Sequence, residues 1–368
     1  MDILERIKKG VQGIHISNMT NSDIAKSTDW VKTPSLDLNR VLSGSLVKGL
    51  PNKNLIAIVG PEGTMKSSFI ILTMAEAQRN GYTPVIIDTE RGVDNAFCSR
   101  WGLNTDNVIY AYTPWVDKVK SILASIKDSG DKKLIIGIDS IGGLDRWKSF
   151  TDALGDNPKS DQGQLQKSIR SLLKLLLNIC IEQESIGIVS GHLYGRPGMI
   201  PLPDQIGGGH AMRLFPSILI NLKKKAIKEE GKTIGTEISA STLKNRIYPP
   251  FQTATVSIDY TKGINVYSGI IDLMLEAGLI EKSGVWYSYR GEKLGQGKTN
   301  AEIALEAFPG LIKKLDEWLK MTGYSNISEG IKEAEELFEQ KEIKKPGPKV
   351  EKIDGKVIVK NERSGEIF

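Results

Sequence analysis

The residues at positions 60–68 have the types and spacing of a loop that binds phosphate. They follow an apolar run at 55–59 and precede a helix-like run at 69–75; in order they are Gly60, Pro61, Glu62, Gly63, Thr64, Met65, Lys66, Ser67 and Ser68. Backbone N–H groups of such a loop, and of the helix that begins after it, point at anionic oxygens. The ammonium of Lys66 would reach the β- and γ-phosphates of a nucleotide, and the hydroxyl of Ser67 would hold Mg²⁺. Met65 departs from the pattern, which has glycine before the lysine.

Two acidic residues at strand ends are candidates to complete such a site. Asp139 ends the apolar run 134–139, where P-loop enzymes place an aspartate that supports the Mg²⁺ shell. Glu90 follows the run 85–88, where a carboxylate can orient the water that attacks a phosphate. Apolar strands ending in Asp are common, however, and a solvated loop glutamate is the simpler interpretation of Glu90 taken alone.

These side chains need a sheet to position them, and the sequence predicts one. Between residue 55 and about residue 260, short β-branched runs alternate with helical stretches. Continuous apolar strands separated by helices indicate a parallel sheet covered on both faces, whose carboxyl edge is where ligand sites form. The expected strands are 55–59, 85–88, 108–111, 134–139 and 186–190, and helical spacing of leucines predicts a core-facing helix at about 164–184. After 218–222 we expect lysine-rich turns, then an antiparallel extension from 236–240 and 253–259.

Composition sets the class of protein. The chain has 368 residues, a charged fraction of 25% and a net charge of +5, which fits a globular protein with a polyanionic partner but does not require one. Its two cysteines, Cys98 and Cys180, exclude a disulfide scaffold and are expected as buried thiols in a reducing compartment. No apolar run approaches the ~20 residues of a membrane-spanning helix, so none is expected. The expected location is cytoplasmic.

Four parts are expected along the chain. Residues 1–35 form an arm with a short charged helix, residues 36–268 a nucleotide-binding core, residues 269–338 a smaller α/β domain, and residues 339–368 a flexible, mildly basic tail. Contact with nucleic acid and simple solubilisation are equally compatible with the charge pattern of the tail.

Several blocks of sequence resemble bacterial RecA recombinases. The closest match is 279–289 with 291–298; the other matching blocks are 90–97 with 100–103, 60–62, 138–140, 244–246 and 263–267. The similarity covers about residues 36–319. It implies a P-loop α/β fold with a RecA-type core, a mostly parallel sheet flanked by helices, an N-terminal helical arm for polymerisation and a small C-terminal α/β domain.

The resemblance also implies an activity and assigns residues to it. RecA proteins are ATP-dependent recombinases that polymerise on single-stranded DNA and exchange strands with homologous duplex DNA. By resemblance, residues 60–68 bind ATP, Ser67 and Asp139 serve Mg²⁺, and Glu90 activates water. The adenine is lined by Asp94, Phe97 and Tyr267. His192 stands where bacterial RecA proteins carry a glutamine that senses the γ-phosphate, and histidine is also a hydrogen-bond donor.

Further basic residues match family positions that act between subunits or on DNA. Lys244 and Arg246 match residues that reach the γ-phosphate of the neighbouring subunit, an arginine-finger arrangement. Two loops, about 147–163 and 193–209, are expected to bind single-stranded DNA. Their candidate residues are Arg146, Trp147, Lys148, Lys159, Arg196, Met199, Ile200, Gly207, Gly208, Gly209 and Arg213. A basic face for duplex DNA is expected from Lys282, Lys293 and Lys298, with a merely solvated face as the equal alternative.

Three departures from bacterial RecA proteins favour the phage-encoded branch of the family: Met65, His192 and the absence of a strongly acidic tail. Mediator and single-strand-binding proteins are then expected partners. Two other functions stay open. One is a hexameric helicase with a RecA core, against which the block 286–298 and the pair Lys244 and Arg246 argue. The other is an ATP-binding filament protein that coats single-stranded DNA and hydrolyses little, because of Met65.

Overall fold

The computed structural model describes residues 3–11, 15–154, 163–194, 205–322, 349–353 and 356–360. The chain divides into two compact units, Met1–Asp316 and Glu317–Phe368. Among the described helices, none combines the length and apolar character needed to cross a membrane.

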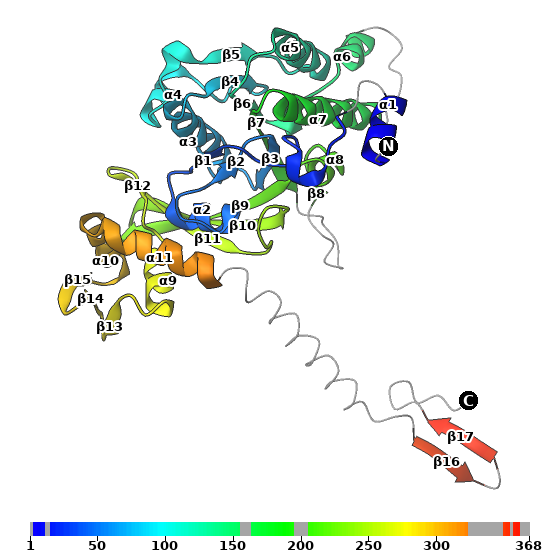
Figure 1. Ribbon diagram of the computed structural model, residues 1–368. Helices are drawn as coiled ribbons and strands as arrows, with labels where there is room; N and C mark the ends of the chain where they lie inside the picture. The colour runs from blue at the N-terminus through cyan, green and yellow to red at the C-terminus, as the bar shows by residue number, and fades with distance from the viewer. Residues whose placement is uncertain are drawn as a thin grey trace. The chain divides into compact units, whose positions relative to one another are not determined.

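A ten-stranded sheet forms the frame of the described part of the first unit (Figure 1). Its strands are β3 (Asn54–Gly60), β4 (Thr83–Asp88), β5 (Ile109–Tyr112), β6 (Leu134–Asp139), β7 (Ile186–Tyr194), β8 (Gln205–Ile206), β9 (Ile218–Glu229), β10 (Lys232–Asn245), β11 (Thr253–Asp259) and β12 (Gly263–Asn265). They follow the order β12-β11-β10-β9-β3-β7-β6-β4-β5, with β8 paired to β7. Pairing is parallel from β9 through β3, β7, β6 and β4 to β5. The predicted α/β fold with a mostly parallel sheet is therefore confirmed.

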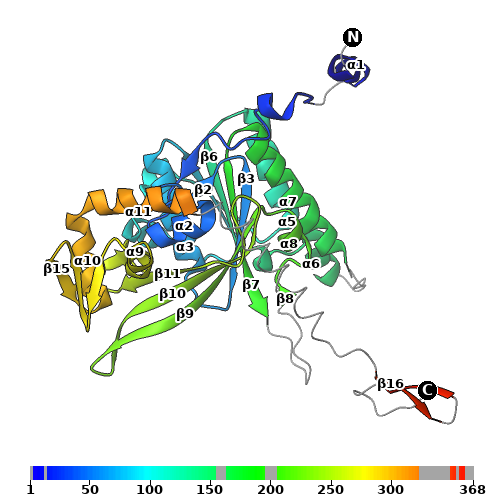
Figure 2. The same cartoon turned by 60° about the horizontal axis from the view of Figure 1, so that its bottom comes forward.

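Helices cover both faces of the central part of this sheet, which explains why a strand such as β3 is buried along almost its whole length. Alternate residues of a strand point to opposite faces. On β3, Ile56 and Ile58 join the core cluster that includes α2 (Leu36–Ser43) and α3 (Lys66–Arg79). Leu55, Ala57 and Val59 join the cluster under α5 (Val116–Ser129) and α7 (Gln164–Glu182). Figure 2 shows α2 and α3 on one side of the sheet and α5 and α7 on the other.

The remaining helices and small strands connect or extend this frame. The helices are α1 (Ile3–Gly10), α4 (Asn95–Arg100), α6 (Trp147–Leu154), α8 (Ala211–Leu214), α9 (Ile270–Glu276), α10 (Lys298–Ala304) and α11 (Pro309–Thr322). Single 3₁₀ turns are η1 (Met19–Asn21), η2 (Thr105–Asn107), η3 (Ile141–Gly143) and η4 (Leu305–Ala307). β1 (Trp30–Val31) pairs with β2 (Leu50–Pro51), and a second small sheet contains β13 (Glu281–Ser283), β14 (Trp286–Tyr289) and β15 (Glu292–Gln296).

Two local expectations were wrong. The lysine-rich segment after residue 222 is not a turn, because β9 continues through Lys223–Lys225 to Glu229 and pairs antiparallel with β10. Pairing with β10 satisfies the backbone N–H and C=O groups of this part of β9, although its side chains are mostly exposed. The first half of the expected loop 147–163 is the helix α6, stabilised by an aromatic cluster that is described below.

The second unit contains a hairpin of β16 (Lys349–Ile353) and β17 (Lys356–Lys360), which lies in the segment expected as the basic tail. A two-stranded hairpin by itself is only marginally stable in water. The division into arm, core, C-terminal domain and tail stays a prediction.

Candidate functional site

The phosphate-loop candidates lie at the carboxyl edge of the sheet, between β3 and α3. Lys66 is the first residue of α3 and is only 7% exposed. Its Nζ donates hydrogen bonds to the carbonyl oxygens of Gly60, at 3.1 Å, and Pro61, at 2.9 Å. Burial lowers the pKa of Lys66. Three carboxylates oppose that shift, those of Asp139, Glu90 and Glu62, so the ammonium lies in a local field of negative charge.

The catalytic candidates come together because four strands end side by side. Pairing sets Gly60 of β3 opposite His192 of β7, and Asp88 of β4 opposite Asp139 of β6. Glu90 lies two residues after the end of β4, and its Oε1 lies 3.7 Å from Nε2 of His192. The structure therefore collects Lys66, Glu90, Asp139 and His192, which are far apart in sequence, at one edge.

Serine hydroxyls orient both acids. The Ser140 hydroxyl donates to Oε1 of Glu90 at 2.5 Å, and the Ser190 hydroxyl donates to Oδ1 of Asp139. The sequence reading assigned no role to either serine. Their only sequence signal is position, since Ser140 directly follows a strand and Ser190 lies within β7.

Asp88 is a further residue that the sequence reading did not use. It is 1% exposed, and its carboxylate accepts the backbone N–H groups of Glu90 (3.0 Å), Gly92 (3.3 Å) and Val93 (3.2 Å). A buried carboxylate that accepts several N–H groups fixes the backbone that supplies them. Asp88 therefore shapes the turn that presents Glu90, and it is a structural rather than a reacting group.

The residues present fit Mg²⁺ bound together with a nucleotide. Within the described residues there is no group of three or more His, Cys, Asp or Glu side chains that could hold a metal by itself. Mg²⁺ in nucleotide sites is typically bound through one or two protein oxygens plus substrate phosphates and water. Ser67, at the start of α3, and Asp139, at the end of β6, are oxygen donors of that kind.

The loop leaves little room for side chains at two of its glycines. A Cβ at Gly60 would lie 2.6 Å from the carbonyl oxygen of Leu222, and one at Gly63 would lie 2.7 Å from Nζ of Lys224. Met65 differs, because a large side chain is accommodated there although its φ is 64° and its ψ is 31°. The left-handed region costs a non-glycine residue roughly 1–2 kcal/mol.

The adenine candidates fall in two places. Asp94 caps α4 by accepting the N–H of Phe97 at 2.7 Å, and the Phe97 ring lies edge-on to Trp101 with centroids 6.5 Å apart. Tyr267 follows β12 and lines a separate cavity of about 630 Å³, whose other walls come from the strands β9 to β12 and from Thr299, Ile303 and Glu306. Burial raises the pKa of Tyr267.

Lys244 and Arg246 are not brought to the phosphate loop of their own chain. Lys244 lies at the end of β10, paired through Leu219 of β9 with Ala57 of β3. Lys244 is therefore level with Ala57, which lies three residues, or roughly 10 Å, before Gly60 along β3. The Lys244 ammonium donates to three backbone carbonyl oxygens: those of Arg213 (2.9 Å), Leu214 (2.9 Å) and Pro216 (2.6 Å). Burial lowers the pKa of Lys244, and the charge of Arg246 adds to that shift.

The first expected DNA loop begins with a cluster of three aromatic rings. Trp147 and Phe150 of α6 pack on Trp115, with centroid distances of 5.2 Å and 5.0 Å. Trp147 stays 47% exposed and Phe150 42% exposed, so both side chains remain partly open to solvent. Arg146 and Lys148 flank Trp147 in the chain. Lys159 lies outside the described residues.

The second expected DNA loop is described only at its ends. Arg196, Met199 and Ile200 lie outside the described residues, whereas Gly207, Gly208, Gly209 and Arg213 lie inside them. Gly208 and Gly209 have φ values of +87° and +72°, and a Cβ at Gly209 would lie 2.2 Å from Oε1 of Gln166. The positive φ values therefore favour glycine where this segment meets α7.

A basic cavity that the sequence reading missed lies at this junction. It measures about 210 Å³ and is lined by Gln166, Lys167, Arg170, His210, Ala211 and Leu214. Lys167 and Arg170 are three residues apart on α7, a spacing that places them on one helix face and that the sequence does show.

The three lysines expected on a duplex-binding face each contact an acidic or an aromatic side chain. Lys298 forms an ion pair with Asp272 at 2.6 Å. The ammonium of Lys293 lies 4.8 Å from the ring centroid of Trp286, and that of Lys282 lies 5.5 Å from the ring of Tyr287. Cation–π contacts of this kind leave the charge available to solvent and to anions.

Two protein families match the chain. The RecA N-terminal domain family matches residues 2–265, and the RecA C-terminal domain family matches residues 268–322. Members of this family are filament-forming, DNA-dependent ATPases that act with Mg²⁺. The first match alone spans more than half of the sequence, and the fold and the strand-edge constellation agree with it. This chain belongs to the RecA family.

Proposed function

We propose that this protein is an ATP-dependent recombinase that forms filaments on single-stranded DNA and promotes homologous pairing and strand exchange. One observation carries the proposal: Lys66, Glu90, Asp139 and His192 lie together at one sheet edge, around a loop of the phosphate-binding type. Phosphoryl transfer needs those elements, namely a cation, a water-orienting carboxylate, a metal-supporting oxygen and a hydrogen-bond donor at the γ-phosphate.

Each residue has a definite task in this proposal. The carboxylate of Glu90, held by Ser140, orients the attacking water. Lys66 neutralises charge on the β- and γ-phosphates, and His192 donates a hydrogen bond to the γ-phosphate. Ser67 and Asp139 would hold Mg²⁺, which supplies further neutralisation of phosphate oxygens when bound. Asp94, Phe97 and Tyr267 bind the adenine.

The site is completed by a second copy of the chain. Lys244 and Arg246 lie away from the loop of their own subunit, which supports a role at the nucleotide of a neighbour. The arm of residues 1–35 mediates this polymerisation. Single-stranded DNA binds along the aromatic cluster of α6 and the basic cavity beside Gly209, where stacking and phosphate contacts are both available. Lys282, Lys293 and Lys298 face the duplex partner.

Finer assignments follow from the sequence. Met65, His192 and the mildly basic tail favour a phage-encoded recombinase that acts in the cytoplasm of its host. Mediator and single-strand-binding proteins are then its further partners.

The decisive experiment combines phosphate release, with and without single-stranded DNA, with a strand-exchange assay. We expect DNA to stimulate hydrolysis, exchange to require ATP, and Lys66→Ala to abolish both. Wild-type hydrolysis that is as low as that of Glu90→Gln, with no stimulation by DNA, would favour a coating filament protein. Electron microscopy on single-stranded DNA separates the remaining alternative, because rings instead of extended filaments indicate a helicase.

A further inference from the structure

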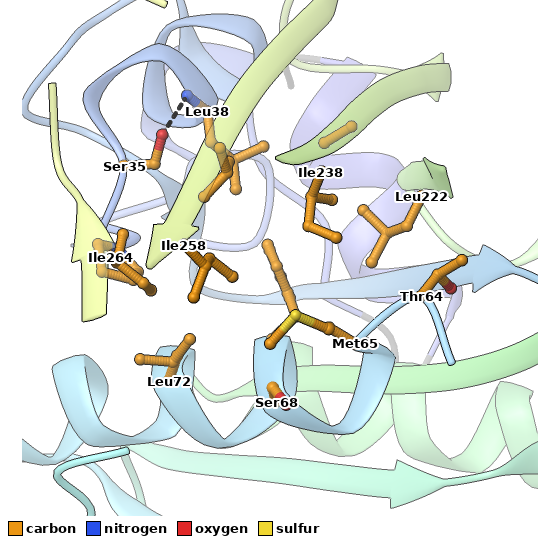
Figure 3. Close-up of a pocket in the computed structure, with 14 residues that line it drawn as sticks. Ser35, Leu38, Thr64, Met65, Ser68, Leu72, Leu222, Ile238, Ile258 and Ile264 are labelled. Carbon is orange, nitrogen blue, oxygen red and sulfur yellow. Dashed lines mark hydrogen bonds between the residues drawn. The ribbon is translucent and has the colours of Figure 1, made fainter. Parts of the chain in front are cut away.

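The side chain of Met65 lies in an apolar pocket between α3 and the strands β9 to β12. Figure 3 shows Met65 between strand residues such as Ile238 and Ile258 on one side and Ser68 and Leu72 of α3 on the other. The surrounding side chains come from α2, α3 and the strands β9 to β12: Leu38, Phe69, Leu222, Ala240, Val256 and Ile264. The lining is almost wholly apolar, so methionine is a fitting occupant.

The space that remains around this side chain is too small for a nucleotide or a cofactor. It measures about 30 Å³. Met65 also packs against the same core cluster as Phe69 and Ile264. The cavity is therefore a packing site for the loop rather than a site for a ligand.

The neighbouring loop positions show why this residue can be large. A side chain at Gly60 would collide with the backbone of β9 at the Leu222 carbonyl oxygen, and one at Gly63 would have to displace the Lys224 ammonium. At position 65 the backbone instead directs the side chain under β9 and β10. The loop thus approaches β9 closely at Gly60, and it packs against the apolar side chains of β9 to β12 at Met65.

We propose that Met65 is a positioning residue that anchors the phosphate loop to the β9–β12 extension. The anchor holds the backbone of Met65 in its left-handed conformation. It thereby fixes the first turn of α3, which contains Lys66 and Ser67. A loop that is ordered before nucleotide binds loses less conformational entropy on binding. This inference rests on the proposed nucleotide site and adds a residue that prepares it.

Two measurements on the full-length protein test the anchor. The first is hydrogen exchange of the amides at 63–68 without nucleotide, and the second is the Kd of a fluorescent ATP analogue without DNA. Met65→Ala should accelerate loop exchange roughly tenfold and weaken nucleotide binding roughly five- to tenfold, because the apolar contact is lost. Met65→Leu, which refills the cavity, should stay within about twofold of wild type on both. Met65→Gly should also loosen the loop, although it relieves the backbone, because glycine widens its freedom.

Variants of the cavity wall separate anchoring from general destabilisation. Ile258→Ala should accelerate loop exchange, and its effect should not add to that of Met65→Ala, since both remove one contact. Ile179→Ala makes the same truncation in the other core cluster and should lower the Tm while loop exchange and nucleotide Kd stay unchanged.

Two results would overturn the anchor. One is a rate of loop exchange in Met65→Ala that equals the wild-type rate. The other is an acceleration of loop exchange by Ile179→Ala that is as large as the acceleration by Met65→Ala. A wild-type protein that binds no nucleotide, but whose loop exchange still responds to Met65→Ala and Ile258→Ala, overturns the proposed function and leaves the anchor standing.

Discussion

The hydroxyl of Ser140 donates a 2.5 Å hydrogen bond to Oε1 of Glu90, across the point where β6 and β4 end side by side. Thr89 reinforces this junction, since its hydroxyl accepts the N–H of Ser140 and donates to the Ser140 carbonyl oxygen, both at 2.8 Å. The orientation of the proposed water-activating carboxylate is thus set by the neighbouring strand.

Removal of this bond should slow hydrolysis without weakening nucleotide binding. In Ser140→Ala the Glu90 carboxylate loses its restraint, and general-base groups contribute typically 10²–10⁴-fold. We expect kcat to fall roughly tenfold, with the nucleotide Kd within twofold of wild type, measured by phosphate release and by titration. Ser190→Ala is the matched control, because it frees Asp139 and should instead raise the Mg²⁺ concentration required. Equal Mg²⁺ responses in both variants would contradict the separate roles.

A mixture of two inactive variants should recover activity if subunits share sites. Lys244→Ala lacks the residue proposed to act on a neighbour, and Glu90→Gln lacks the residue that acts in its own subunit. In mixed filaments, some interfaces combine an intact Glu90 with an intact Lys244. We expect DNA-stimulated phosphate release to rise from near zero for each variant alone to a clear fraction of wild type on mixing. Since Lys244 also binds carbonyl oxygens in its own chain, its Tm is the control for folding.

Folding stability should fall as pH rises between about 4.5 and 7 because of Glu302. This residue is 4% exposed, and burial raises its pKa from 4.5 to about 7, although hydrogen bonds from Gly269 and Asn265 partly oppose the shift. In that window the folded state binds more protons than the unfolded state, so deprotonation disfavours folding. The change amounts to about 3 kcal/mol at most.

Denaturant unfolding at pH 5 and pH 8 measures this effect. Glu302→Gln should remove most of the pH dependence and stabilise the protein at pH 8. The exposed Glu276→Gln should leave the pH dependence intact, and the same loss of dependence in both variants would rule out Glu302 as its source.

Trp147 should contribute base stacking to single-stranded DNA binding. Stacking on an aromatic side chain is worth ≈ 1–3 kcal/mol per base. Trp147→Ala should therefore weaken the Kd for single-stranded DNA about tenfold at fixed salt, with an unchanged dependence on salt concentration, since no phosphate contact is lost. Trp147→Phe keeps a ring face and should retain most of the affinity. Fluorescence anisotropy of labelled DNA over a range of salt concentrations measures both quantities.

The sequence predicts the centre of this fold well and its edges less well. Strands such as β3 and β6 are readable because burial on both faces produces a continuous apolar run. The hairpin of β9 and β10 cannot be read from the sequence, because residues such as Lys224 are exposed and only backbone pairing holds them in a strand. Helix α6 was missed because its aromatic residues resemble those of a binding loop until Trp115, from another segment, is seen beneath them.

The candidate site divides in the same way. Lys66 and Asp139 are suggested by motif and strand position, and Glu90 only by the family resemblance. The serines that hydrogen-bond to Glu90 and Asp139 depend on which strands are neighbours. The location of Lys244 is a matter of register, which no single segment encodes. Met65 looks like a defect in a motif until the cavity that receives its side chain is seen.

Strand β7 links the proposed nucleotide site to the proposed DNA site, so the affinities for ATP and for DNA can depend on each other. It carries His192 beside Gly60, and its far end pairs with β8, while the N–H of Gly207 donates to the His192 carbonyl oxygen at 2.8 Å. The proposed γ-phosphate donor and the glycines next to the proposed DNA site are therefore joined directly by backbone hydrogen bonding. Thermodynamic reciprocity then requires that, if DNA raises the affinity for ATP by some factor, ATP raises the affinity for DNA by the same factor.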